Sequence, residues 1–458
     1  MQETNVISVE TVNFDEQIES YLRNYKLTGI PIEVSFRDLV PDLYKPDRYT
    51  HLIHSYPAKL LMHIPYFFLN NNMFSKKGEL ILDCFSGSGT VMLEAILAER
   101  NAIGADANPL ARLISKVKVH QYSYDSLTNH FEDLLSNIKL RPDGISPNVP
   151  NVNFWFLPNI TSQLKVIFNA ISLIEQTEIR DFFLVCFSNC VKKVSLADPR
   201  VSVPVKLNPD RYKQSHPLYE ESKRKLDGLN YLNVTEKFIE IVNDNIQRFK
   251  LLGQKRLNTY TASIISNDAR NLTTDIGSSE KMLDGSVSLI ISSPPYAGAQ
   301  KYIRSSSLNL GWLNMVYDEC TLKDLDAQNI GRENYKKSEY VNFRATGIVE
   351  ADILLQKIYK INPLRAHIAG NYLREMREAF KEAYRVLKSG GYIVLVVGNN
   401  QVCGLEFETQ QYLKLILEDL GMTTVLRLID DIQSYGLMTK RNKTANVITR
   451  EWVLVLKK

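Results

Sequence analysis

Residues 293–296 read Ser-Pro-Pro-Tyr and follow the apolar run VSLII, which predicts that they leave the end of a buried strand. Pro294 and Pro295 stiffen the backbone and remove two amide donors. The Ser293 hydroxyl and the Pro294 carbonyl, both rigidly held, could accept hydrogen bonds from the N–H groups of one amine. The Tyr296 ring offers a flat surface for a planar group. Taken alone, the string is more typical of an ordinary turn.

A glycine-rich turn, DCFSGSGT over residues 83–90, is expected between a strand and a helix. Gly87 and Gly89 allow a tight turn and a close approach of the backbone to a ligand. A dinucleotide fingerprint needs a third glycine where Met92 stands, and the Lys-Ser/Thr pair of a phosphate loop is absent. The turn favours a ligand other than a pyrophosphate, and a turn that binds nothing is the alternative.

Two acids are expected at the ends of the next strands. Asp106 ends the second strand, where a carboxylate can accept hydrogen bonds from both hydroxyls of a ribose. Asp268 ends the third strand, where an acid could hold the edge of an adenine. Each could instead cap the following helix, although Asn108 could do this in place of Asp106. The row of strand ends predicts a ligand site at the carboxyl edge of a parallel sheet.

The elements that must position these residues alternate as strand, helix, strand, helix over residues 79–120, which favours a parallel sheet. The segment after His51 predicts a helix that follows the proline. Helical periodicity dominates residues 121–258, and strand patterns return near 261–270, 286–296, 390–400, 422–431 and 451–458. We therefore expect one doubly wound sheet domain, residues 41–120 and 259–458, with a mainly helical insertion at 121–258 and a lead-in at 1–40. A second insertion is expected at about 299–370.

Composition sets broad limits. Hydrophobic residues make up 44% and charged residues 23%, as in ordinary globular proteins, and the net charge of +4 permits a nucleic-acid partner without arguing for one. The five scattered cysteines have no second pair that would complete a zinc site, so we expect reduced, buried thiols and no metal. The acidic, polar first residues are not a signal peptide, and no segment has the length of a membrane span. These features favour the cytoplasm.

At this point a resemblance becomes specific. FSGSG, an acid after the second strand, NDAR and SPPY occur in the order found in the DNA amino-methyltransferases that use S-adenosylmethionine, and HSYPAKLL at 54–61 resembles the element that precedes the glycine turn there. The resemblance covers roughly residues 40–120 and 260–458. It implies a Rossmann-like class I methyltransferase fold. It also implies that these residues contact the cofactor: Lys59, Asp83, Phe85, Gly87, Gly89, Thr90, Asp106, Asn267 and Asp268.

The same resemblance implies that Ser293, Pro294, Pro295 and Tyr296 form the catalytic segment and receive a base flipped out of the duplex. Serine before Pro-Pro-Tyr goes with cytosine-N4 in this family, and Asp or Asn with adenine-N6. Cytosine-C5 enzymes need a thiol nucleophile, typically in a Pro-Cys pair, and this sequence has none. A prokaryotic cytosolic restriction-modification system, with an endonuclease acting on the same site, is the implied setting.

Contacts with duplex DNA are expected from basic segments. From Lys192 to Lys225 nine Lys/Arg face four Asp/Glu, a local excess of five positive charges. The candidates in the helical insertion and beyond it are Arg200, Lys206, Arg211, Lys213, Arg304, Lys440 and Arg441. A solvated basic loop is the alternative.

Other functions remain open at this stage. The first alternatives are adenine-N6 methylation of DNA and methylation of an amine in RNA. A nucleic-acid-binding protein with a vestigial cofactor fold would not bind S-adenosylmethionine. A nicotinamide-dependent reductase is disfavoured by Met92 and by the Ser-Pro-Pro-Tyr segment.

Overall fold

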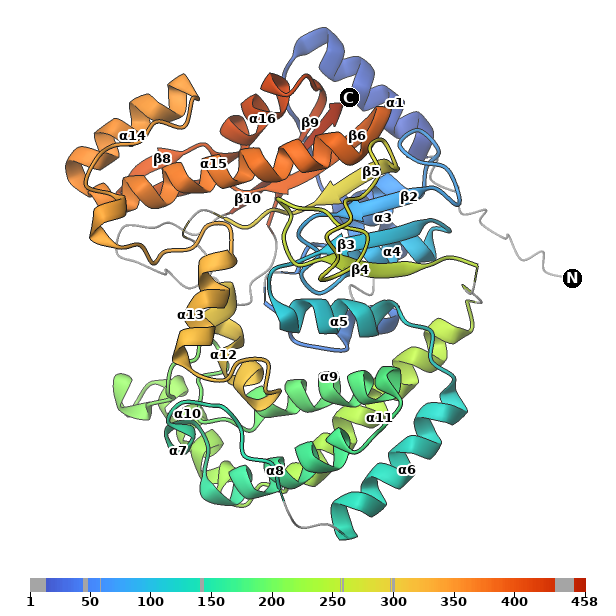
Figure 1. Ribbon diagram of the computed structural model, residues 1–458, viewed down its shortest axis with the longest axis vertical. Helices are drawn as coiled ribbons and strands as arrows, with labels where there is room; N and C mark the ends of the chain where they lie inside the picture. Colours follow the sequence, from blue (N-terminus) through green and yellow to red (C-terminus); the bar gives the residue numbers. More distant parts are fainter. Residues whose placement is uncertain are drawn as a thin grey trace, which may run out of the picture.

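The computed structural model describes residues 14–43, 48–57, 59–140, 144–255, 257, 259–296, 298, 301–432 and 449–458. Its centre is an eight-stranded sheet in the order β1-β9-β10-β6-β5-β2-β3-β4 (Figure 1). The strands are β1 (Ile32–Val34), β2 (Leu80–Asp83), β3 (Asn101–Ala105), β4 (Ala262–Ser266), β5 (Val287–Ser292), β6 (Leu387–Val397), β9 (Thr423–Asp431) and β10 (Arg450–Lys457). Of these eight, only β10 runs antiparallel to its neighbours. The predicted doubly wound, mostly parallel sheet is confirmed, and it is consistent with a Rossmann-like methyltransferase fold.

Alternate residues of the central strands enter two different cores, because side chains in a strand point to opposite faces. Ile81, Leu289 and Ile291 join a core with helices on one face, whereas Leu82 and Ile290 join a core on the other. The helices that contribute to the first core include α3 (His63–Leu69), α4 (Thr90–Leu97) and α5 (Pro109–Val119), and those of the second are α14 (Val349–Ile361), α15 (Pro363–Val386) and α16 (Thr409–Asp419). Every residue of β5 is buried, which explains its continuous apolar run.

The direction in which the chain adds strands to the sheet reverses between β2 and β5. From β2 the sheet grows through β3 and β4, and from β5 it grows the other way through β6. In open parallel sheets, ligands bind in the crevice outside the carboxyl ends of the strands at such a switch point. The residues that end β2 and β5 are Asp83 and Ser292.

The predicted helical segment 121–258 forms a body below the sheet in Figure 1. Its helices are α6 (Tyr124–Leu140), α7 (Val152–Trp155), α8 (Pro158–Ser172), α9 (Thr177–Lys193), α10 (Pro217–Leu229) and α11 (Val234–Gly253). Helix α9 packs on α5 of the sheet domain and on α12 (Tyr302–Trp312), which follows the Ser-Pro-Pro-Tyr segment. The insertion is therefore attached to both parts of the chain that build the sheet edge.

Some local structure differs from the sequence prediction. The helix expected after Pro57 is α3, which begins only at His63, and residues 49–52 form a 3₁₀ turn (η2). The lead-in contains helix α1 (Phe14–Thr28), but it also supplies β1, which extends the sheet beside β9. A small hairpin, β7 (Asn400–Val402) and β8 (Leu405–Phe407), was not expected. Its strands are too short to show the alternation of apolar and polar residues by which a strand is recognised.

Three of the four cysteines whose side chains are described lie in the interior. Cys84, Cys186 and Cys190 are buried free thiols, and burial raises the pKa of Cys186 and of Cys190 to about 12. Cys403 is half-buried. None of the helices described is long and apolar enough to cross a bilayer.

A buried ion pair fixes the irregular segment before α3 against the sheet domain. Glu94 of α4 has no exposed surface, and its Oε1 lies 2.8 Å from Nε2 of His51 in η2. Arg48 forms an ion pair with the same carboxylate. Burial opposes ionisation, but His51 and Arg48 together hold the pKa of Glu94 below its ordinary value. The segment leading to Tyr56 is therefore anchored electrostatically.

A second pair of acids lies at the end of the β9–β10 ladder. Glu451 stands directly opposite Asp430, so the two side chains share a face of the sheet. Burial raises the pKa of Glu451 to about 7, and the neighbouring Asp430 adds to this. Burial also raises the pKa of Asp430 to about 6. Two carboxyls in one poorly solvated place cannot both ionise easily.

Replacing Glu94 by alanine should strongly destabilise the fold. The change leaves Arg48 and His51 without their acceptor, and breaking a buried pair typically costs about 3–5 kcal/mol. Thermal unfolding measures the effect. The matched control is Glu378→Ala, which removes an exposed pair with Lys381 on α15 and should cost at most about 1 kcal/mol. Equal losses in the two variants would contradict the anchoring role of Glu94.

Replacing Glu451 by glutamine should make stability less sensitive to pH. Between the ordinary pKa of 4.5 and about 7 the folded protein retains a proton that the unfolded chain releases, so stability falls as the pH rises through this window. The variant has no such proton and should gain about 1–3 kcal/mol over the wild type between pH 5 and pH 8. Urea unfolding midpoints across this range test it, and a difference independent of pH would contradict it.

Candidate active site

The switch point is closed by a hydrogen-bonded group from two strands. Ser292 at the end of β5 donates from Oγ to Oδ1 of Asp83 at the end of β2, at 2.6 Å. The backbone N–H of Phe85 donates to the same Asp83 oxygen at 3.1 Å and to Ser292 Oγ at 3.2 Å. Burial raises the pKa of Asp83 to about 7, against the effect of both donors. Ser292 is not among the predicted site residues, although a polar residue that ends a fully buried strand needs a partner.

The glycine turn needs both of its glycines. Gly87 and Gly89 have φ angles of +51° and +76°, which side chains disfavour. A Cβ on Gly89 would lie only 3.0 Å from the Cα of Ser115 on α5, so a side chain there is crowded as well as strained. Thr90 is the first residue of α4 and is buried, and Phe85 is half-buried. Met92, which replaces the third glycine of the dinucleotide fingerprint, packs against Gly104 of β3.

Asp106 closes this turn from the end of β3. Its Oδ2 accepts the N–H of Gly87 at 2.8 Å, and its Oδ1 accepts the N–H of Asn108 at 2.8 Å. Burial raises the pKa of Asp106, opposed by both N–H groups. Asn108 caps α5 by accepting the N–H of Leu110, as expected if Asn108 takes the place of Asp106 as the cap of this helix. Asp106 therefore does not cap α5, and its carboxylate lies against the glycine turn at the carboxyl edge of the sheet.

A contact that the sequence did not predict ties the segment after β3 to α12, which follows the Ser-Pro-Pro-Tyr segment. The Asn108 amide donates to Tyr56 Oη and to Ser306 Oγ on α12, both at 3.1 Å. Tyr56 is buried, and its ring lies 3.9 Å from the position that a Cβ of Gly87 would take. These residues lie far apart in the sequence, so no spacing could show that they meet.

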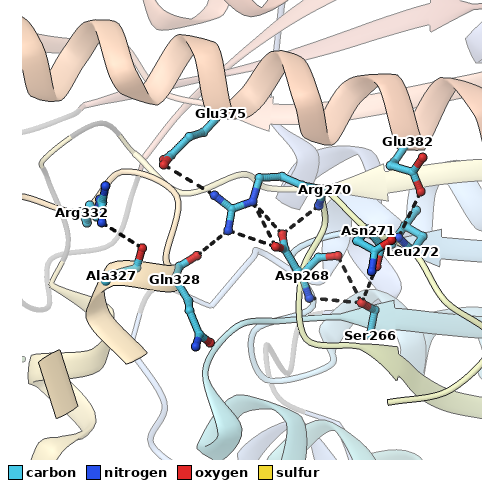
Figure 2. Close-up of polar contacts among 10 residues, drawn as sticks. All are labelled: Ser266, Asp268, Arg270, Asn271, Leu272, Ala327, Gln328, Arg332, Glu375 and Glu382. Carbon is cyan, nitrogen blue, oxygen red and sulfur yellow. Dashed lines mark hydrogen bonds and ion pairs between the residues drawn. The ribbon is translucent and has the colours of Figure 1, made fainter. Parts of the chain in front are cut away.

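The loop after β4 is held by an arginine. Asp268 accepts from Arg270 through both oxygens, with Nε to Oδ1 at 2.8 Å and one terminal nitrogen to Oδ2 at 3.0 Å (Figure 2). The N–H of Asp268 donates to Ser266 Oγ at 3.1 Å. Asn267 beside it is exposed. Asp268, the acid expected near an adenine, is thus oriented by Arg270. The side-chain amide of Asn267 is free to face solvent or a ligand.

The Ser-Pro-Pro-Tyr segment leaves β5 at the switch point. Pro294 is buried, while Ser293, Pro295 and Tyr296 are partly exposed. Tyr296 Oη donates to Glu451 Oε1 at 3.4 Å, and burial raises the pKa of Tyr296 well above its ordinary value. The segment therefore combines a fixed backbone, an accessible hydroxyl and a ring that is held at its far end.

Lys59, a predicted cofactor contact, and His54 of the HSYPAKLL element lie in the segment before α3. Lys59 Nζ donates to the carbonyl of His51 at 2.9 Å, which bridges the two ends of the segment. His54 is buried, with Nε2 at 3.1 Å from Ser188 Oγ on α9. Burial lowers the pKa of His54 to about 3, so it is neutral at physiological pH. This environment fits a packing residue rather than a base.

The candidate DNA-contacting residues differ in availability. Arg200 forms two 2.8 Å hydrogen bonds with Asp198 and lies 5.3 Å from the Tyr212 ring centre, so its guanidinium is engaged within the protein. Lys206, Arg211 and Lys213 in the insertion are exposed, as is Arg304 on α12. Lys440 and Arg441 lie outside the described residues. Within the described chain no group of three or more His, Cys, Asp or Glu could hold a metal ion.

Comparison with known proteins places this geometry in context. Residues 50–116, which contain the glycine turn and Asp106, match the N6/N4 methyltransferase family model, described as DNA methylase. The type II methyltransferase M.MvaI of Kocuria varians is 24% identical over 438 residues, covering 89% of this chain and 91% of that protein. M.BsoBI of Geobacillus stearothermophilus is 21% identical over 387 residues, covering 76% and 74%. M.MjaII of Methanocaldococcus jannaschii is 32% identical over 92 residues, covering 20% and 17%. The chain is thus a distant homologue of type II methyltransferases and is related to the N6/N4 DNA methylase family.

Proposed function

We propose that this protein transfers a methyl group from S-adenosylmethionine to N4 of cytosine in a specific duplex DNA sequence, as the modifying enzyme of a type II restriction-modification system. The observation that carries the proposal is the Ser-Pro-Pro-Tyr segment, which leaves β5 at the switch point beside Asp83 and the glycine turn. The relation to DNA amino-methyltransferases supports the reaction class, and Ser293 supports cytosine over adenine.

The residues around the glycine turn suit the cofactor. S-adenosylmethionine supplies an electrophilic methyl group together with a ribose and an adenine. Gly87 and Gly89 allow the backbone to approach the methionine part, Asp106 offers carboxylate oxygens to the ribose, and Asn267 with Asp268 lies after the next strand. Lys59, Asp83, Phe85 and Thr90 complete the proposed set. The absence of a pyrophosphate-binding pattern is consistent with this choice.

The catalytic segment would act by positioning and by fixed dipoles. The lone pair of an exocyclic amine is delocalised into the ring, and acceptors aimed at its N–H groups localise it on nitrogen. Ser293 Oγ and the Pro294 carbonyl would be these acceptors, and the rigidity of Pro294 and Pro295 keeps them in place. Tyr296 would stack on the flipped base, which is worth about 1–3 kcal/mol. The methylated amine is acidic enough to lose its proton to water, so a strong base is not required.

The recognition of DNA would fall mainly to the helical insertion. Its exposed cations Lys206, Arg211 and Lys213, with Arg304 on α12, would contact phosphates or base edges. Arg200 would support the loop through Asp198 rather than reach the DNA. An endonuclease cutting the same site is the proposed biological partner.

Incubation with tritiated S-adenosylmethionine and mixed duplex DNA, followed by digestion to nucleosides, should place the label in N4-methylcytosine. Label in N6-methyladenine would keep the fold and cofactor but show that Ser293 does not select the base, and Ser293→Asp would then test how far this side chain matters. Label in added tRNA but not in DNA would contradict the proposed substrate. The Tyr296→Ala variant should place less label in the same nucleoside.

Cofactor binding and turnover should separate in two variants. Asp106→Ala leaves the N–H groups of Gly87 and Asn108 without acceptors and removes the carboxylate that would bind the ribose. The Kd for S-adenosylmethionine should therefore rise about 10–100-fold. Tyr296→Ala should leave this Kd within about threefold but reduce turnover by about 10-fold or more, because base stacking is lost. Isothermal titration and a methyl-transfer assay measure both. Equal losses of cofactor affinity would contradict this division, and binding of NADH in place of S-adenosylmethionine would contradict the cofactor.

A further inference from the structure

Arg270 joins three segments of the chain that are distant in sequence. From the loop after β4 it reaches Asp268 through two donors, and it donates to the carbonyl of Gln328 at the end of α13 (Glu319–Gln328) at 3.0 Å. A third nitrogen lies 3.5 Å from Glu375 Oε1 on α15 (Figure 2). The Arg270 side chain is 24% exposed, so these contacts are largely shielded from water.

The contacts continue from Glu375 to the catalytic segment. Burial raises the pKa of Glu375, and Arg270, Arg332 and the nearby N–H of Gly331 oppose this effect. Gly331 has a φ of +82° and packs so closely on Tyr296 that a Cβ would lie 3.4 Å from the Tyr296 carbonyl oxygen. The buried ring of Tyr372, one turn before Glu375, lies 3.6 Å from the same position. Arg270 therefore contacts helix α15 at Glu375, and Tyr372 of the same helix lies next to Gly331 and so next to Tyr296.

The chemistry of the guanidinium suits this place better than any other cation. A planar fork binds a carboxylate through two parallel hydrogen bonds and fixes its rotation, which an ammonium group cannot do. The Nη2 that donates to Asp268 also donates to the Gln328 carbonyl, and Nη1 is the nitrogen nearest Glu375. One side chain thus sets the orientation of the half-buried Asp268 and compensates the charge of Glu375, whose side chain is 15% exposed.

We propose that Arg270 is a positioning residue that couples the cofactor loop to the catalytic segment. This inference rests on the proposed function, in which Asp268 lies at the adenine and Tyr296 at the base. Loss of Arg270 frees the Asp268 carboxylate to rotate, which weakens cofactor binding. It also removes the ion pair that holds Glu375, which shifts α15 where Tyr372 packs on Gly331, displaces the Tyr296 backbone and slows transfer even when the cofactor is saturating.

The test compares Arg270→Gln and Arg270→Lys with Asp268→Asn and Glu375→Gln in the full-length protein. Isothermal titration gives the Kd for S-adenosylmethionine, and single-turnover transfer at saturating cofactor gives the rate. For Arg270→Gln we expect the Kd to rise about 10–100-fold and the saturated rate to fall about 10-fold or more, since charged hydrogen bonds are lost at both ends. Arg270→Lys should not restore either value, because lysine cannot bind bidentately.

The single-site variants separate the two ends of the link. Asp268→Asn should change mainly the Kd, and Glu375→Gln mainly the saturated rate. The matched control is Arg377→Gln. Arg377 lies on α15, as Glu375 does, but it pairs with the exposed Asp419, so this variant should match the wild type in both measurements. Thermal unfolding shows whether each variant is folded, and Arg270→Lys keeps the charge if Arg270→Gln does not fold.

Several results would overturn the coupling. If Arg270→Lys restores both values, charge alone suffices and the bidentate geometry is irrelevant. If only the Kd or only the rate changes in the Arg270 variants, Arg270 serves one site and does not link the two. A wild-type protein that binds no S-adenosylmethionine would overturn the proposed function itself, and this is seen before any variant is compared.

Discussion

The hydrogen bond between Ser292 and Asp83 is the contact on which the geometry of the site depends. It joins the carboxyl ends of β2 and β5, the two strands between which the winding of the sheet reverses. The N–H of Phe85 donates to both residues, so the start of the glycine turn is fixed to the start of the Ser-Pro-Pro-Tyr segment. The proposed cofactor and catalytic segments are therefore held in register by a buried acid and a serine that act within the protein.

The rest of the site is built outward from this point by polar contacts between distant segments. Asp106 closes the glycine turn, and Asn108 connects it to Tyr56 and to Ser306 on α12. Another set joins the helical insertion to the sheet domain, where the Asn309 amide donates to the carbonyl of Ser188 at 2.7 Å. Buried polar groups that are all partnered fix one arrangement, because any shift leaves a donor or acceptor unsatisfied. The two insertions thereby become parts of the site.

Charge is distributed unevenly around this edge. Burial raises the pKa of Asp83, Asp106 and Glu451, which lie near the glycine turn and the catalytic segment. Glu94 and Asp268 are instead held by arginines, Arg48 and Arg270. Glu94 anchors the segment before α3 and Asp268 is oriented at the end of β4, whereas Asp83, Asp106 and Glu451 form no ion pair with an arginine of the described residues. Arginine pairing therefore occurs both away from the proposed ligand edge, at Glu94, and on it, at Asp268.

The strands, the glycine turn and the helical insertion could be predicted from sequence because each follows from a local pattern. Alternation and apolar runs define β2 to β6, and the left-handed turn at Gly87 and Gly89 follows from glycine itself. The expectation that Asn108 could cap α5 also proved correct. The late start of α3 and the strand β1 did not follow, because both depend on neighbours far along the chain.

The sequence by itself determined which residue types stand at the strand ends, and hence the class of chemistry that the edge can perform. Only the tertiary structure decided their partners. Asp83 finds Ser292 across 209 positions, and Arg270 finds Gln328 across 58, separations at which no periodicity constrains contact. A side chain's type limits what it can bind, but the packing of the whole sheet and its two insertions decides which partner lies within reach.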